Sequence, residues 1–356
     1  MHPAMAVAGT ALLAVGSSAP AGTPWFSQPT TAVVSRDVTF ADGDAKLHGT
    51  LYLPERSAKV PAVVVFHGAS EPLASTPLYA HLRDGLPQIG IAVLLFDRRG
   101  TGASTGKADV PYRTLVDDGI AGARAIRTLP LIDPVRVGYW GISQGGWLAT
   151  LAAARDPRAA FAVAVSAPLV TAELQMEFAM SNRLSVLGYS QTDVDDMLAA
   201  RRQVNGYFTG ANSRAEAVAA LTKIESRPWF DLMYLPKASS LPDDPANSPW
   251  REQMDVNFFA AVEQVKIPML FILGGQDPWI PVSATVARLR AIASTHPRLE
   301  YVVVPNANHL MMTPPAREQM NDADPRQIAA EKPDVTGYFT LLGSWLSRVV
   351  NALKVQ

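Results

Sequence analysis

Apolar residues along the chain follow two patterns that predict two kinds of strand. Near the start, apolar and polar positions alternate over Leu47–Leu53, and the turn Asp42–Asp44 separates this stretch from Val33–Phe40. This spacing predicts a half-buried β-hairpin. Further along, strand-like runs are almost continuously apolar and rich in Val, Ile and Phe, which is typical of strands buried on both faces. These runs are Val60–Phe66, Ile91–Phe96, Val135–Trp140, Phe161–Ser166, Pro268–Leu273 and Leu299–Val304.

Helical periodicity fills most of the intervals between the buried runs. An alternation of strands and helices predicts right-handed crossovers and a doubly wound, mostly parallel sheet, which is an α/β fold. A final amphipathic stretch, Thr336–Val355, is expected to cover one face of that sheet. The intervening helical stretches are Leu78–Ile89, Val116–Thr128, Gln144–Arg155 and Ala284–Ser294.

One long segment interrupts the alternation. Residues 168–262 contain no buried-strand run, and their helical patches are followed by a stretch rich in proline and aromatic residues. A segment of this length is too long to be a loop. It predicts a mainly helical cap between the sixth and seventh strands, with residues 30–167 and 263–356 forming the core. The helical patches are Ala172–Leu187, Asp193–Val204 and Arg214–Ile224.

Composition excludes several classes of protein. Hydrophobic residues make up 48% of 356 residues, which supports a large core and excludes a disordered chain. Lys and Arg number 31 against 32 for Asp and Glu, and without a polybasic run we expect no nucleic-acid partner. Cysteine is absent, which removes disulfides and metal–thiolate sites. The glycine-rich segment Gly100–Lys107 fails both the Walker A and the dinucleotide patterns, so we expect no cofactor. No H-E-x-x-H motif or other ligand cluster is found, so we expect no metal.

The first 21 residues have the features of a leader. Ala4–Val15 is an apolar run of small residues, followed by the polar break Gly16–Ser18 and the triplet Ala19–Ala21. Together they predict a signal peptide cleaved near Gly22 and hence export to the periplasm or medium, although no Lys or Arg precedes the run. A disordered leader on a cytoplasmic protein is the alternative. The run is shorter than the roughly 20 residues of a membrane-spanning helix, so we expect no stable membrane insertion.

The strongest chemical motif lies between a predicted strand and a predicted helix. Val135–Trp140 leads directly into Gly141-Ile142-Ser143-Gln144-Gly145-Gly146, which contains G-x-S-x-G. This context is typical of a nucleophile elbow, in which a sharp turn exposes the serine hydroxyl above the carboxyl edge of the sheet. Glycines are needed there because side chains would clash with the adjacent strand and helix. We therefore expect Ser143 to be a nucleophile.

A serine hydroxyl becomes a good nucleophile only beside a base. His309 lies just past the last buried strand, where a loop would return it over the carboxyl edge, so we expect it to be the base. His67 directly precedes Gly68 and is better suited to shaping a loop. The other four histidines lie in the leader, on the exposed side of the hairpin, in a predicted surface helix and in a polar turn: His2, His48, His81 and His296.

A carboxylate is needed to orient the imidazole. Asp277 follows the seventh predicted strand, next to the strand that precedes His309. The order Ser143, Asp277, His309 is the order of an α/β-type triad. Four other carboxylates in the core precede the serine and do not fit this order: Asp97, Asp117, Asp118 and Asp133.

Acyl transfer also needs donors for the oxyanion of the tetrahedral intermediate. The elbow geometry assigns one of them to the backbone N–H of Gln144. The second is expected from the loop after the third predicted strand, with the N–H of Ala69 as the first choice and Ser70 as the alternative.

These residues together resemble the α/β-hydrolase family, in particular its capped bacterial esterases and serine-aminopeptidase-like members. The motifs that carry the resemblance are His67-Gly68, the loop Asp97–Ser104, Gly141–Gly146, Gly274–Asp277 and His309. The resemblance implies a sheet of eight strands whose second strand is antiparallel, and an architectural role for Asp97–Arg99. Asn308 departs from the family, because relatives often have glycine before the histidine.

The resulting expectation is a serine esterase that cleaves small carboxylic esters through an acyl-enzyme on Ser143. The first alternative is an amide hydrolase of the peptidase or aminopeptidase type, in which Glu173, Glu177 or Asp231 of the cap would bind a substrate amine. The second alternative is a non-catalytic binding protein on the same fold. Acyl specificity and oligomeric state cannot be predicted from these patterns, because many chemistries share the fold.

Overall fold

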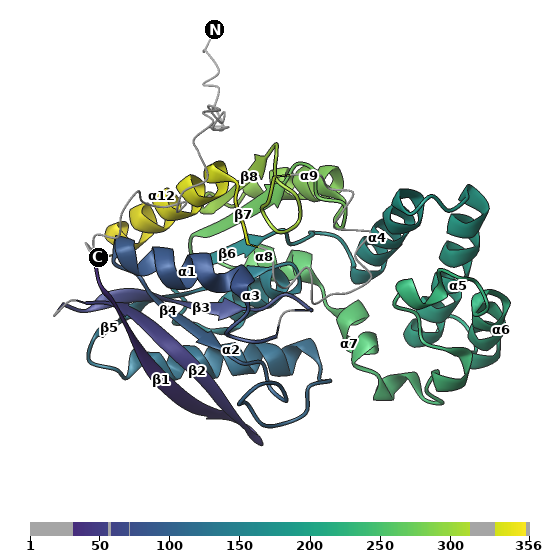
Figure 1. The fold of residues 1–356 in the computed structure, drawn as a ribbon, viewed down its shortest axis with the longest axis horizontal. Helices are drawn as coiled ribbons and strands as arrows, with labels where there is room; N and C mark the ends of the chain where they lie inside the picture. Colours follow the sequence, from purple (N-terminus) through teal and green to yellow (C-terminus); the bar gives the residue numbers. More distant parts are fainter. Residues whose placement is uncertain (1–30, 56–57, 71, 314–331, 354–356) are drawn as a thin grey trace, which may run out of the picture.

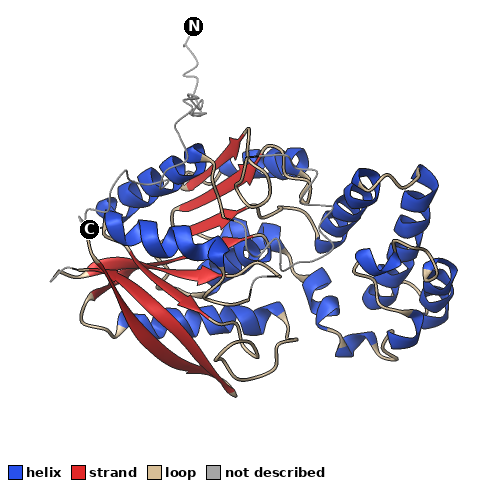
Figure 2. Ribbon diagram, in the orientation of Figure 1, coloured by secondary structure: helices blue, strands red, loops and turns tan. Residues whose placement is uncertain are grey.

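An eight-stranded sheet forms the centre of the structure, and helices pack on both of its faces (Figures 1 and 2). The structure is a computed structural model that describes the chain except residues 1–30, 56–57, 71, 314–331 and 354–356. The expected leader, residues 1–21, lies outside the described residues.

The strands follow the order β1-β2-β4-β3-β5-β6-β7-β8 across the sheet. β2 is antiparallel to both of its neighbours, β1 and β4, and every other pairing is parallel. The α/β fold and the antiparallel second strand are thus confirmed. The strands are β1 (Val33–Asp42), β2 (Ala45–Pro54), β3 (Val60–Phe66), β4 (Ala92–Phe96), β5 (Ile132–Ile142), β6 (Ala162–Val165), β7 (Met269–Gly274) and β8 (Leu299–Val304).

Burial along the strands explains the two hydrophobic patterns in the sequence. In β2, the side of Leu47 and Leu51 is buried while the intervening residues are partly exposed, because this strand lies near the edge of the sheet. Every residue of β3 and β4 is buried, because helices cover both faces of the central strands. The carboxyl ends of β3, β5, β7 and β8 therefore meet at one edge, where the loops that follow them can form a site.

The two faces of the sheet are covered by different helices. α1 (Ala80–Gly85) and α12 (Thr336–Ala352) pack on one face. The other face is covered by α2 (Tyr112–Arg127), α3 (Gln144–Arg155), α8 (Phe258–Gln264) and α9 (Val282–Ala293). The helix expected over 78–89 is interrupted: the 3₁₀ turns Pro77–Tyr79 and Leu86–Ile89 each have a proline in their first two positions, and α1 is the short α-helical piece between them.

Helices inserted between β6 and β7 form a hydrophobic core of their own. They are α4 (Ala172–Val186), α5 (Gln191–Thr209), α6 (Arg214–Ile224) and α7 (Pro249–Asp255), with short 3₁₀ turns between α6 and α7. Capping boxes at Ser190 and Ser213 begin α5 and α6. α7 and α8 were not expected as helices, because prolines and aromatic residues obscure their short periodicity. α8 packs on the core instead, where Phe258 stacks on Trp147 with ring centroids 4.4 Å apart.

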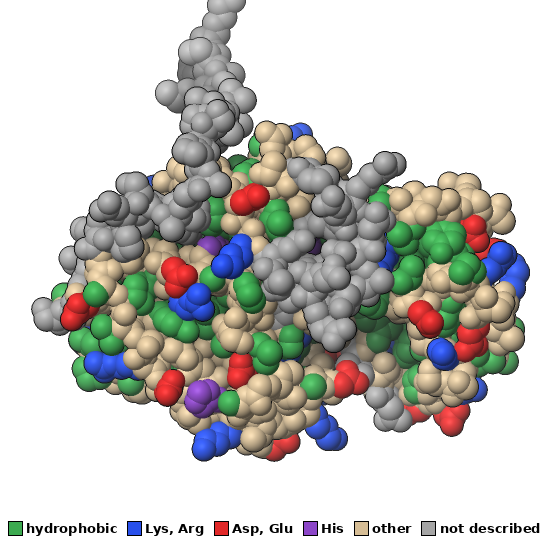
Figure 3. Space-filling model, in the orientation of Figure 1, with side chains coloured by type: hydrophobic (Ala, Val, Ile, Leu, Met, Phe, Trp, Pro, Cys, Tyr) green, Lys and Arg blue, Asp and Glu red, His purple; other side chains and the backbone are tan. Residues whose placement is uncertain are grey.

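The surface gives no sign of a strongly charged or membrane-spanning protein in the part of the chain that the structure describes. On the face shown in Figure 3, basic and acidic side chains are interspersed. None of the described helices combines the length and the apolar character that a bilayer span requires.

Candidate active site

Ser143 occupies a sharp turn between β5 and α3. Its backbone has φ 56° and ψ −123°, a conformation that residues other than glycine rarely adopt. Two backbone hydrogen bonds hold it: the Ser143 N–H donates to the Val165 carbonyl at 2.8 Å, and the Ser143 carbonyl accepts from the Gly146 N–H at 2.9 Å. Neighbouring β6 and the first turn of α3 therefore stabilise a strained residue at the edge of the sheet.

The three glycines around Ser143 are required by space. A Cβ on Gly141 would lie 1.9 Å from the Gly145 carbonyl oxygen, and one on Gly145 would lie 2.2 Å from the carbonyl oxygen of Phe66 in β3. A Cβ on Gly146 would lie 2.5 Å from the Ala167 Cβ. The G-x-S-x-G-G sequence is therefore required because α3 packs so closely against β5 and the adjacent backbone that no side chain fits at these three positions.

Asp277 and His309 form a hydrogen-bonded pair at the same edge. His309 Nδ1 lies 2.8 Å from Asp277 Oδ2, and the Asp277 side chain is fully buried. The other carboxylate oxygen, Oδ1, accepts the backbone N–H groups of Trp279 at 2.8 Å and Ile280 at 3.3 Å. The carboxylate is therefore fixed in position, and it leaves Nε2 as the ring nitrogen available for proton transfer.

The contacts of Asn308 explain why asparagine can stand where relatives often have glycine. Its side-chain Oδ1 accepts the N–H groups of Leu310 at 3.0 Å and Met312 at 2.9 Å, and its backbone N–H donates to the Met312 carbonyl. These bonds close the loop that carries His309, as asparagine often does in turns. The asparagine thus stabilises the loop with its side chain.

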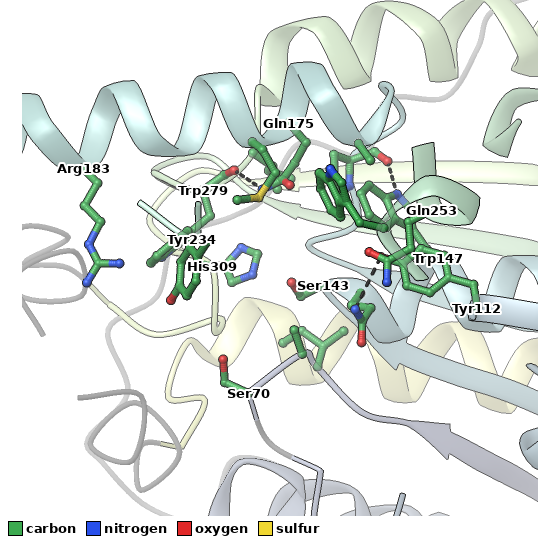
Figure 4. Close-up of a pocket in the computed structure, with 18 of the residues that line it drawn as sticks. Ser70, Tyr112, Ser143, Trp147, Gln175, Arg183, Tyr234, Gln253, Trp279 and His309 are labelled. Atoms are coloured by element: carbon green, nitrogen blue, oxygen red, sulfur yellow. Dashed lines mark hydrogen bonds between the residues drawn. The ribbon is translucent and has the colours of Figure 1, made fainter. Parts of the chain in front are cut away.

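A cavity of about 270 Å³ lies above the edge of the sheet, between the core and the inserted helices. Ser143 and His309 both line it, and Figure 4 shows them adjacent to each other. Gln144, Ala69 and Ser70 line it as well, so four of the five expected site residues border one cavity while Asp277 lies behind His309. The structure therefore brings together residues that are up to 240 positions apart, from 69 to 309.

Side chains of the core hold the loop that contains Ala69. The Gly68 N–H donates to the Tyr79 hydroxyl at 2.9 Å, and the Arg98 guanidinium donates to the carbonyls of His67 at 3.1 Å and Gly68 at 2.9 Å. These bonds orient the backbone immediately before Ala69. Arg98 is thus a structural support for the loop.

The residues on either side of Arg98 also have architectural contacts. Asp97 accepts the backbone N–H groups of Ala74 and Ala103, each at 2.9 Å. Arg99 is buried and pairs with Asp118 at 2.6 Å. These contacts agree with the role that the family resemblance implied for Asp97–Arg99.

The remaining core histidines lie away from the cavity. His67 is buried edge-on against Tyr79 and Phe96, and burial together with the nearby Arg98 lowers its pKa to about 3. The expectation that His81 lies on a surface helix is wrong. Its ring is buried between α1 and α12, where Nε2 lies 2.9 Å from the Tyr338 hydroxyl.

Several cavity residues were not identified from the sequence. They come from α2, α3, α4, α7, the stretch between α6 and α7, and the loop after β7: Tyr112, Trp147, Gln175, Met176, Arg183, Tyr234, Trp250, Gln253 and Trp279. Tyr234 has φ 49°, which is unusual for an aromatic residue. No local motif marks these positions, because they belong to helices and loops that meet only in the folded chain.

The described residues were also compared with the requirements of a metal site. No group of three or more His, Asp or Glu side chains there is arranged to hold a metal ion.

Comparison with known proteins gives one family and several relatives. The model of the family described as X-Pro dipeptidyl-peptidase (S15 family) matches residues 42–311. Thiohydrolase apmlB of Arthrinium phaeospermum is 34% identical over 121 residues, which cover 33% of this chain and 38% of that protein. The matched segment thus spans well under half of this curated relative.

Solved structures share the fold at low sequence identity. The α/β hydrolase GrgF from Penicillium sp. sh18 superposes with a TM-score of 0.55 at 19% identity, over 90% of this chain and 99% of that one. The esterase Pf2001 of Pyrococcus furiosus superposes with a TM-score of 0.52 at 16% identity, over 95% and 99% of the two chains. These likenesses establish the α/β-hydrolase fold.

Proposed function

The chain belongs to the X-Pro dipeptidyl-peptidase (S15) family, and we propose that it is a serine hydrolase whose preferred substrates are carboxylic esters. One observation carries the proposal: the hydrogen-bonded pair His309–Asp277 and the strained Ser143 border a single cavity. An imidazole held by a buried carboxylate beside an exposed hydroxyl is the arrangement that activates serine.

The proposed reaction follows from the positions of these groups. Ser143 attacks the ester carbonyl while His309 Nε2 takes the hydroxyl proton, and Asp277 holds the imidazole and stabilises its charged form. The backbone N–H of Gln144, at the start of α3, and that of Ala69 stabilise the oxyanion. His309 then protonates the leaving alcohol, and a water molecule activated by the same residue releases the acid.

The lining of the cavity favours esters over peptides with a free amino terminus. Such a peptide needs an acidic anchor, and Glu173, Glu177 and Asp231 of the inserted segment were the candidates. None of these three carboxylates lines the cavity, and no Asp or Glu is among its described lining residues. An ammonium group would therefore be desolvated there without a partner.

The resemblance to a thiohydrolase extends the proposal to thioesters as a second class of substrate. Thioesters react through the same acyl-enzyme, with a thiol as the leaving group. A substrate panel should therefore contain oxygen esters, thioesters and aminoacyl anilides of the same acyl group. Higher kcat/KM on anilides than on esters would overturn the ester preference and support the peptidase alternative.

Covalent labelling tests the nucleophile directly. A fluorophosphonate probe should label the intact protein on Ser143, and Ser143→Ala should abolish labelling without changing the thermal unfolding temperature. Ser70→Ala is the matched control, because Ser70 is a second serine in the same cavity and should leave the label in place. Absence of labelling in the folded wild-type protein would instead support a non-catalytic binding protein.

A further inference from the structure

The cavity is lined differently on the two sides of Ser143, and the side formed by α2, α3 and α7 is aromatic (Figure 4). Tyr112 and Trp147 lie there with ring centroids 6.2 Å apart, and Trp250 of α7 joins them. This side presents a rigid, uncharged wall that fits an apolar or aromatic group.

The side beyond His309 carries a positive charge. Arg183 of α4 lines it, and its guanidinium carbon lies 5.7 Å from the ring centre of Tyr234 and 5.9 Å from that of Trp279. The Trp279 ring lies 6.4 Å from the His309 ring. Among the described residues of the cavity wall, Arg183 is the one Lys or Arg, and no Asp or Glu is present.

The position of Tyr234 depends on two arginines of the inserted helices. Arg183 donates to the Leu232 carbonyl at 3.0 Å, and Arg201 of α5 donates to the Met233 carbonyl. Both side chains are buried. They hold the turn that ends at Tyr234, a residue with a strained φ of 49° and an exposed fraction of 56%. Strain maintained in this way places an exposed aromatic ring on the cavity wall.

The acyl-transfer mechanism determines which part of a substrate lies on which side of Ser143. This inference rests on the proposed function. When the acyl-enzyme forms, a bond from Ser143 Oγ to the carbonyl carbon replaces the bond from that carbon to the leaving-group oxygen. The proton that His309 took from Ser143 goes to that oxygen. The leaving group must therefore lie beside His309, on the side of Arg183, while the acyl group extends towards Tyr112 and Trp147.

We propose that the leaving group of the preferred substrate carries an anionic substituent, such as a carboxylate, which Arg183 binds, and that its acyl group is uncharged. A guanidinium that is largely shielded from water forms strong charge-assisted hydrogen bonds with carboxylates. The rings of Tyr234 and Trp279 beside it can stack on a planar group that bears the charge. A carboxylate on the acyl side would face Tyr112, Trp147 and the neutral amide of Gln253, with no cation among the described lining residues there to offset its lost hydration.

Three matched esters test the charge preference in the wild-type protein. They are phenyl acetate, 3-carboxyphenyl acetate, with the charge on the leaving group, and the monophenyl ester of succinic acid, with the charge on the acyl group. Each kcat/KM is divided by the rate of alkaline hydrolysis of the same ester. We expect the 3-carboxyphenyl ester to exceed phenyl acetate by about tenfold or more, and the succinate ester to fall at or below phenyl acetate. Equal values, or a preference for the succinate ester, would overturn the proposal.

A pair of variants tests whether Arg183 is responsible. Arg183→Met should reduce the ratio between the 3-carboxyphenyl ester and phenyl acetate to about one, and Arg183→Lys should retain part of it. Arg202→Met is the matched control, because it removes the same charge from an exposed residue of α5 that pairs with Glu177. Its ratio should stay at the wild-type value. A ratio that persists in folded Arg183→Met would overturn the assignment, and if that variant does not fold, the wild-type comparison decides.

The failure of this inference can be distinguished from failure of the proposed function. If the serine mechanism is wrong, none of the three esters is hydrolysed and the fluorophosphonate does not label Ser143. If only the leaving-group inference is wrong, all three esters are hydrolysed and the label is present, but the charge on the leaving group gives no advantage.

Discussion

The α/β core and the inserted helices position their cavity residues by different means. In the core, the backbone decides: Ser143 lies in a strained turn, and the space around Gly145 excludes any side chain. In the inserted helices, side chains determine the positions of the cavity residues. Buried Arg183 and Arg201 donate to carbonyl groups of the turn that ends at Tyr234 and hold it in place. We infer from this comparison that reactivity depends on the backbone geometry of the core, whereas the proposed selectivity depends on side chains of the inserted helices.

Buried charge shows the same contrast. In the core, Arg99 and Arg127 pair with buried carboxylates, Asp118 at 2.6 Å and Asp156 at 2.8 Å. In the inserted helices, Arg201 is buried against backbone carbonyl, and burial lowers its pKa to about 10. In the core these two arginines pair with carboxylates, whereas Arg201 of the inserted segment donates to the backbone and, in our proposal, Arg183 binds substrate.

The largest expected effect comes from the proposed triad in the core. Asp277→Asn should lower kcat on every ester by about 10⁴-fold, because the imidazole loses the partner that fixes its tautomer. Steady-state kinetics on acetate and longer acyl esters measure this effect. Asp231→Asn in the inserted segment is the control, since this exposed carboxylate lies outside the cavity lining and should leave kcat unchanged. A loss restricted to some esters would contradict the division between reactivity and selectivity.

Glycine substitutions compare the two regions in stability. Gly145→Ala should lower the free energy of unfolding by about 3 kcal/mol or more, because the new Cβ would meet the Phe66 carbonyl oxygen at 2.2 Å. Gly210→Ala at the end of α5 should cost about 1 kcal/mol, because its φ is 82° but no atom lies within 4 Å of the new Cβ. Urea unfolding curves measure both values. Equal losses in the free energy of unfolding would show that the space around the backbone at Gly145 is no tighter than at Gly210.

Acidic pH should destabilise the core before the inserted helices. Burial lowers the pKa of His67 to about 3 and that of His81 to about 4. The unfolded chain therefore takes up protons first as the pH falls below about 6.5, and stability is lost from there down to about pH 4. Between about pH 7 and about pH 5, each histidine should remove about 2 kcal/mol.

Hydrogen exchange resolved by region measures this difference. The segment 168–262 contains no histidine, so exchange in α5 and α6 should respond less to acid than exchange in β3 and α1. His81→Gln should weaken the pH dependence of the core, whereas His48→Gln, at a partly exposed position of β2, should leave it unchanged. Parallel responses in both regions would argue against histidine burial as the cause.

The smallest expected effect is on a helix cap. Ser213→Ala removes the capping box of α6, in which the Ser213 hydroxyl and the Glu216 carboxylate bond each other's backbone. The free energy of unfolding should fall by about 1 kcal/mol. The normalised ester rates should not change, because α6 does not reach the cavity. Changed ratios between the normalised ester rates in this variant would show that a change in α6 is transmitted through the inserted helices to the cavity.

Much of the core was predictable because its signals are local. Six strands were recognisable from continuous apolar runs and the first two from the hairpin pattern. The elbow around Ser143 was recognisable from glycines whose spacing reflects steric exclusion within one turn. Asp277 and His309 could be placed at one edge because parallel strands end together. Their hydrogen bond itself depends on the loop that Asn308 closes, which required the structure.

Other features have no local signal. His81 was expected on the surface, but its ring contacts Tyr338, 257 residues further along the chain. The helical periodicity around His81 does not show that a distant helix packs over this side chain. Arg183, Tyr234 and Trp279 come from three separate segments, so no motif could identify them as one wall of the cavity.

The sequence by itself therefore determined the fold class, the order of the strands along the chain and the candidates for nucleophile, base and acid. The reason is that hydrophobic period and glycine sterics act over a few residues. Only the tertiary structure decided which side chains surround those groups, because packing joins residues that are distant along the chain and each contact depends on the shape of all its neighbours.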